Sequence, residues 1–98
     1  MKAILSIINQ LFEIEKKTQG QPSVHRNLER IRAELQELGY SWHNPLHEKY
    51  AATRTDCEAS ITGELRDEMT ITDVIKPIIH SQESGSPRIV QKAIVVVA

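Results

Sequence analysis

The histidine, cysteine and carboxylate residues of this chain are the ones whose chemistry could build a metal site. His43 and His47 lie four positions apart, and Asp56, Cys57 and His80 could converge on them. Zinc accepts ligands of these types. However, an Asn-Pro pair between the first two histidines breaks the helix that would aim them in one direction, and no Cys-x-x-Cys or His-Glu-x-x-His motif occurs. We therefore predict surface histidines on loops, with no bound metal and no other cofactor.

Cys57 is also a candidate nucleophile. A cysteine beside a histidine can form a catalytic dyad. The residues from Thr53 to Gly63 alternate between apolar and polar, and this alternation places Cys57 on the buried side of a strand with Ala59 and Ile61. A buried cysteine behaves as a small hydrophobic residue, so we expect a core role instead of catalysis.

The opposite side of the same strand carries three charged residues, Arg54, Asp56 and Glu58. Two carboxylates could act as an acid–base pair, but the arginine on the same face would hold both in the ionised state. This pattern is typical of a solvated face or of a surface that recognises another protein. The four glycines form no phosphate-binding motif. We therefore predict that the protein is not an enzyme.

Size and charge exclude several classes of protein. The chain has 98 residues, enough for one small domain, and a formal net charge of −1. This charge gives no electrostatic reason to expect binding to nucleic acid or to a membrane surface. The single cysteine excludes an internal disulfide and suits a reducing compartment.

The first residues resemble the start of a signal peptide, but the apolar run stops at Asn9 and Gln10. No small-residue cleavage pattern follows, and no segment is long enough to span a membrane. We therefore expect an amphipathic helix and a cytoplasmic protein.

Two helices are predicted in the N-terminal part. Apolar residues at helical spacing predict the first over about residues 2–17, and a Gln-Gly-Gln-Pro segment ends it. The second begins with Ser23 as N-cap and ends at Gly39, a residue suited to a left-handed cap. Together they should form an antiparallel hairpin whose excess apolar surface predicts a homodimer containing a four-helix bundle. The heptad seam predicted to form the dimer interface consists of Val24, Leu28, Ile31, Leu35 and Leu38.

After residue 39 the pattern changes to strands. Residues 40–43 and 53–63 are strand candidates, and Met69–Thr72 leads into a C-terminal hairpin. The hairpin has strands over 74–80 and 88–97 and a turn over 81–87, while Pro77 predicts an edge strand or a bulge. The predicted class is α+β, with a helical dimerisation domain at 1–39 and a compact, mainly antiparallel β-domain at 40–98.

The order of these motifs resembles the GrpE family, nucleotide exchange factors of the DnaK chaperone. The resemblance rests on Leu38-Gly39-Tyr40, on Asn44-Pro45-Leu46-His47-Glu48 and on the ungapped match of Pro87–Ala98 to the family's last strand. It implies a homodimer without the family's long stalk, and chaperone contacts by Arg88 and Val97. Where the family has a second arginine in that strand, this sequence has Gln91. The glycine-aromatic pair that the family has before the final hairpin turn is missing, and Ile79-His80 lies near its place.

The resemblance implies a protein-binding module that engages a DnaK-type ATPase and promotes nucleotide release. The alternative is a non-catalytic dimeric adaptor of the same fold with a different client protein. In that case the charged face formed by Arg54, Asp56 and Glu58 would be the recognition surface.

Overall fold

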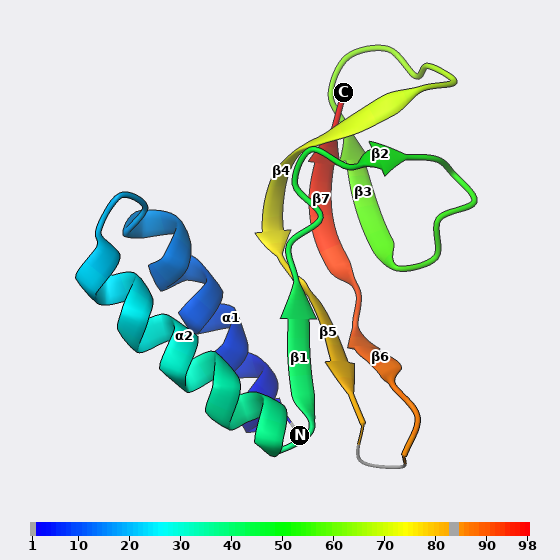
Figure 1. Ribbon diagram of the computed structural model, residues 1–98. Coiled ribbons are helices and arrows are strands. Elements are labelled where there is room, and N and C mark those ends of the chain that lie inside the picture. The colour runs from blue at the N-terminus through cyan, green and yellow to red at the C-terminus, as the bar shows by residue number, and fades with distance from the viewer. Residues whose placement is uncertain (1, 83–84) are drawn as a thin grey trace.

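The computed structural model describes residues 2–82 and 85–98 and shows two helices beside a β part (Figure 1). This arrangement confirms the predicted α+β class. The elements in chain order are α1 (Lys2–Lys17), α2 (Pro22–Glu37), β1 (Tyr40–His43), β2 (Lys49–Tyr50), β3 (Cys57–Ile61), β4 (Met69–Lys76), β5 (Ile78–Ser81), β6 (Arg88–Gln91) and β7 (Ala93–Val97).

The helical hairpin follows the sequence pattern closely. α1 ends at Lys17, as predicted, and α2 begins at Pro22 instead of after Ser23. The predicted N-cap is therefore wrong, because proline has a fixed φ suited to a first helical turn and lacks the N–H that such a turn leaves unpaired. Gly39 has a φ of 93°, the left-handed conformation expected after α2, and its N–H donates to the Gln36 carbonyl.

The β part contains two sheets. One has the order β1-β5-β6 and is antiparallel throughout; the other has the order β2-β4-β7-β3, in which β3 runs parallel to β7. The predicted C-terminal hairpin is a long ribbon that passes through both sheets, as β4 with β7 and then β5 with β6. Pro77 separates β4 from β5, and the pairing register shifts on both sides of it, which confirms the predicted bulge. The turn predicted over 81–87 includes positions 83–84, which lie outside the described residues.

β3 is shorter than the alternation predicted. Residues 53–56, the first part of the predicted strand, are not in β3. The chain turns there instead, with a hydrogen bond from the Arg54 N–H to the Ala51 carbonyl. Cys57 is buried as expected, but Ile61 is 47% exposed, so its predicted place on the inner face is wrong. The reason is that Ile61 pairs with the last residue of β7 at the end of the sheet, where the chain turns into an exposed loop.

A single hydrophobic cluster joins the helices to the β part. Ile8 and Phe12 of α1 and Leu35 of α2 pack with Tyr40 and Trp42 of β1 and with buried residues of β4, β5 and β7. Burial of each such side chain contributes about 1.5–3 kcal/mol. The predicted boundary at 39/40 therefore marks the change from helix to strand, and both parts contribute to one core.

Polar contacts reinforce this packing at three places. The Arg32 guanidinium lies 4.2 Å from the Trp42 ring centroid. Lys16 Nζ donates to the Val74 carbonyl at 2.8 Å. The side-chain amides of Asn9 and Gln91 exchange two hydrogen bonds of 2.9 Å, which tie α1 to β6. The helical hairpin is thus fixed to the sheet along the length of α1.

Candidate functional site

Arg54 is the centre of a charged cluster that the sequence only partly revealed. Its guanidinium donates to Asp56 Oδ1 at 2.6 Å, to Glu48 Oε1 at 2.7 Å and to the Lys49 carbonyl at 2.9 Å. Glu48 also contacts His43 through its other carboxylate oxygen. The cluster therefore links the end of β1, the start of β2 and the turn before β3.

The electrostatics of this cluster favour ionised carboxylates. The hydrogen bond from Arg54 holds the pKa of Asp56 below its ordinary value, against partial burial. Partial burial raises the pKa of Glu48, but hydrogen bonds and charge from Arg54 and His43 outweigh it and lower the pKa overall. The hydrogen bond with Asp56 likewise raises the pKa of Arg54. These groups neutralise one another, so none of the three is available as an acid or base at neutral pH.

We expect the stability of the fold to fall as the pH drops below about 4.5. Carboxylates with lowered folded-state pKa values stabilise the protein above their ordinary values, which are 4.5 for Glu48 and 3.8 for Asp56. Their contribution is lost as the pH falls through the folded-state pKa values. Urea unfolding between pH 7 and pH 3 measures this loss.

The matched control for that experiment is Arg54→Met. It should cost about 1–2 kcal/mol at pH 7 because two carboxylates lose their partner. It should also flatten the acid limb of the curve. An acid limb equally steep in both proteins would show that other groups govern the acid sensitivity.

The residues proposed for metal binding or nucleophilic catalysis are not assembled. No group of three or more histidine, cysteine or carboxylate residues suited to a metal occurs in the described part of the chain. Burial raises the pKa of the Cys57 thiol to about 11, so the thiolate is scarce at neutral pH. Cys57 is a core residue, as the sequence indicated.

The predicted partner contacts fall in different environments. Arg88 is exposed at the start of β6, next to Ile89, which is 42% exposed. Val97 is fully buried in the shared core, so the predicted contact at Val97 is wrong: the last strand pairs on both sides, with β3 and β4. Of the predicted charged face, Glu58 is exposed, whereas Arg54 and Asp56 are partly buried and bonded to each other.

The predicted dimer seam divides into two sets. Leu28 and Leu35 are each only 8% exposed within one chain, so their assignment to the dimer interface is corrected to the interior of the protomer. Val24 is partly buried. Ile31 of α2 and Leu38, the residue that caps the C-terminus of α2, remain 40% and 63% exposed and are seven residues apart, a heptad spacing.

α1 has a similar exposed pair that the sequence analysis did not single out. Ile7 and Ile14, also seven residues apart, are 53% and 44% exposed, while the neighbouring Ile8 and Phe12 face the core. We call these four exposed residues the outer seam: Ile7, Ile14, Ile31 and Leu38.

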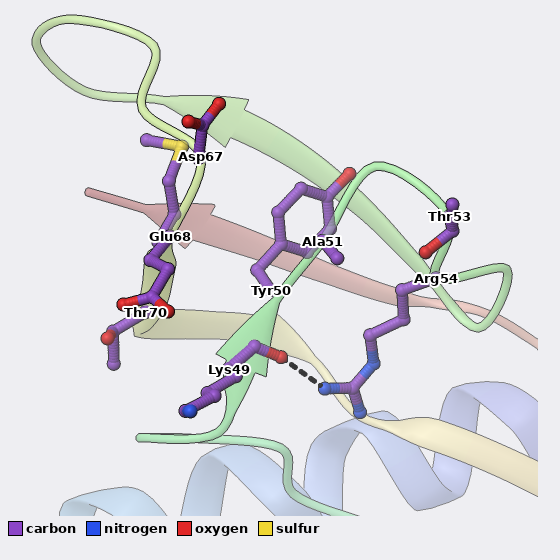
Figure 2. A pocket seen from close by; sticks show the side chains of 9 residues that line it. Lys49, Tyr50, Ala51, Thr53, Arg54, Asp67, Glu68 and Thr70 are labelled. Carbon is purple, nitrogen blue, oxygen red and sulfur yellow. Dashed lines mark hydrogen bonds between the residues drawn. The ribbon is translucent and has the colours of Figure 1, made fainter.

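Two adjoining cavities lie at the end of the four-stranded sheet that also carries the Arg54 cluster. The first, of about 370 Å³, lies among the residues drawn in Figure 2, with Lys49, Tyr50 and Arg54 on one side and Asp67 and Glu68 on the other. The second, of about 300 Å³, continues past Tyr50 toward Ile61 and Leu65. Sequence reasoning missed both, because residues 63–68 have the composition of a polar turn, in which Leu65 carries no periodic signal.

None of the protein-family models, curated proteins or solved structures compared with this chain matches it. Neither helix in the described ranges is long and apolar enough to cross a membrane.

Proposed function

We propose that this protein is a dimeric, non-enzymatic protein-binding module that engages a DnaK-type ATPase and promotes nucleotide release in the manner of the GrpE family. The observation that carries the proposal is the outer seam, four exposed isoleucine and leucine side chains on a two-helix hairpin. Exposed apolar residues that recur at heptad spacing on both helices of a hairpin pack well against a second hairpin.

A second copy of the chain is the simplest partner for the outer seam. Two hairpins related by a two-fold axis would form a four-helix bundle, with each β part attached to the bundle through α1. The predicted interface then consists of Ile31, Leu38 and partly buried Val24, joined by Ile7 and Ile14.

The proposed mechanism is selective binding and requires no cofactor. A β part that binds the open form of an ATPase more tightly than the closed form shifts the population toward the open form, from which nucleotide leaves faster. Arg88 is the contact we propose, because it is exposed at the start of β6 and carries no ion pair in the described part of the chain.

Arg88→Ala should reduce the acceleration of nucleotide release at least about tenfold, as expected for the loss of an arginine anchor. The measurement is stopped-flow release of a fluorescent nucleotide from the DnaK-type ATPases of the host. Lys92→Ala, the loss of another exposed cation on the same hairpin, is the control and should have little effect. Unchanged release with Arg88→Ala would remove this contact from the proposal.

A different client protein is the second candidate, and two observations favour it. Val97 is fully buried, and Gln91, which stands where the GrpE family has an arginine, is held by Asn9 and by the Pro77 carbonyl. Two of the positions that the family resemblance associates with chaperone contact are therefore occupied within the chain. Absence of accelerated release with every DnaK-type ATPase of the host would select this adaptor function.

We also propose a cytoplasmic location, without a nucleic-acid or membrane partner. The chain has one cysteine, which is buried, and a net charge of −1. A reducing compartment and a protein partner fit both features.

A further inference from the structure

α2 carries a row of charged residues beside the outer seam. All of them are exposed, and none forms an ion pair within the described chain. We call this row the flank, and it consists of Arg26, Arg30, Glu34 and Glu37. Successive residues of an α-helix are about 100° apart around its axis. The whole flank therefore falls on the side of Ile31 that faces away from buried Leu28 and Leu35.

The order of charges along the flank runs against the dipole of α2. The flank is basic before Ile31 and acidic after it. α2 has no acidic residue in its first turn and no basic residue in its last turn. The reverse order stabilises a helix, because the N-terminal end of a helix is positive and the C-terminal end is negative. The stability of α2 within one chain therefore does not account for this order, whereas a partner of complementary charge does.

The apolar residues that adjoin the flank are spaced symmetrically about Ile31. Val24 lies seven residues before it and Leu38 lies seven residues after it. A two-fold axis that crosses α2 at Ile31 would place each Val24 opposite the partner's Leu38, and the two helices would run antiparallel. The basic half of each flank would then meet the acidic half of the other.

We propose that two copies of the chain pair through α2 in antiparallel orientation, about a two-fold axis at Ile31. The proposal rests on the dimer proposed above and adds its orientation and the flank as its polar contacts. Arg26 would pair with the partner's Glu37, and Arg30 would pair with the partner's Glu34. By symmetry each ion pair occurs twice. Opposite charges that face each other across two helices select the orientation in which the helices associate.

The other two-fold arrangement of a four-helix bundle has its axis along the helices, so that α2 lies beside the partner's α1. α1 carries an exposed lysine near each end, Lys2 and Lys17. This arrangement would bring Glu37 near the partner's Lys2 but Arg26 near the partner's Lys17, so attraction and repulsion would balance. With α2 beside the partner's α2, every charge of the flank meets an opposite charge. The attractive contacts then outnumber the repulsive ones, which are limited to the two lysines of α1.

Two charge variants of the full chain, compared by sedimentation velocity, test the orientation. The acidic variant combines Arg26→Glu with Arg30→Glu, and the basic variant combines Glu34→Lys with Glu37→Lys. In either variant alone like charges face each other, so the dissociation constant should rise at least about tenfold over that of the unmodified chain. An equimolar mixture of the two variants should associate as tightly as the unmodified chain. Both should keep the circular dichroism spectrum, because each brings the charges of α2 closer to the order that its dipole favours.

The outcomes separate the orientation from the dimer. A mixture that recovers none of the lost association would show that α2 does not pair with the partner's α2. An acidic variant that associates more tightly than the unmodified chain would show that α2 lies beside the lysines of the partner's α1. Either result would overturn the proposal and leave the dimer standing. An unmodified chain that stays monomeric would contradict the dimer itself, and the orientation with it.

The matched control for net charge combines Arg66→Glu with Lys92→Glu. It changes the net charge by the same amount as the acidic variant, at two exposed positions of the β part. The dissociation constant should stay within about twofold of that of the unmodified chain, because charges far from the interface are screened by salt. An equal loss of association in this control would show that the overall charge is responsible and would overturn the proposal.

Distances between spin labels provide a test that does not depend on affinity. Pro22→Cys and Glu29→Cys each place a label at an exposed position of α2, and the unmodified chain, whose Cys57 is buried, is the labelling control. About an axis at Ile31, the two copies of a label move apart by up to about 3 Å for each residue between the label and Ile31, twice the helical rise. Double electron–electron resonance should therefore give a distance about 10 Å longer for labels at position 22 than for labels at position 29. Equal distances at the two positions would indicate an axis along the helices and would overturn the proposal.

Discussion

Leu35→Asp is expected to unfold the chain or to remove most of its stability. The side chain is 8% exposed and belongs to the cluster that joins α2 to β1 and β5. Loss of a buried leucine together with burial of a carboxylate should cost about 4 kcal/mol or more. A domain of this size has a total stability of about 5–15 kcal/mol. Urea unfolding followed by circular dichroism measures the loss.

The control is Leu38→Asp, the same change one turn later on the same seam. Leu38 is 63% exposed, so the protein should keep its fold with a change of about 0.5 kcal/mol. Equal destabilisation by both variants would contradict the division of the seam into buried and exposed residues.

Ile31→Glu is expected to separate the proposed dimer into folded monomers. The side chain is 40% exposed in one chain and would be covered in the four-helix bundle. Because the interface is two-fold symmetric, each substitution occurs twice and buries two unpaired carboxylates. The dissociation constant should rise at least about 100-fold, whereas the circular dichroism spectrum should not change. Sedimentation velocity over a range of concentrations measures the shift.

Ala33→Glu is the matched control for that experiment. Ala33 is exposed on α2, two residues from Ile31 and therefore on another side of the helix. It adds the same charge and should leave the association unchanged. Equal dissociation by Ala33→Glu would point to a general charge effect instead of the outer seam.

The elements with strong periodicity could be predicted from the sequence. The spacing of apolar residues predicted both helices, and the return strand predicted over 88–97 corresponds to β6 and β7. Pro77 indicated the bulge, because proline cannot continue a ladder of hydrogen bonds. These features depend on local sequence, and the structure contains them, with the start of α2 at Pro22 instead of after Ser23.

Features that depend on tertiary neighbours could not be predicted in the same way. Alternation predicted β3, but not that it pairs in parallel with β7 and leaves an open edge. The heptad pattern of α2 did not show which leucines face the sheet of the same chain, so Leu28 and Leu35 were assigned to a dimer. Arg54 looked available for recognition because Glu48, its second carboxylate partner, lies six residues away on another element.

The two adjoining cavities at the end of the four-stranded sheet could not be predicted from the sequence for the same reason. Their lining comes from two segments, residues 49–54 and 61–70, and Leu65 in a polar loop carries no periodic signal. Only the structure shows that this exposed leucine lines the same cavity as Tyr50 and Ile61.

Sedimentation equilibrium of the unmodified chain at micromolar concentration tests the proposed dimeric module most directly. We predict a mass twice the 11.1 kDa of one chain, with Ile31→Glu at the mass of one chain. A folded monomer of the unmodified protein would contradict the outer seam as an interface between two copies and would remove the four-helix bundle from the proposal.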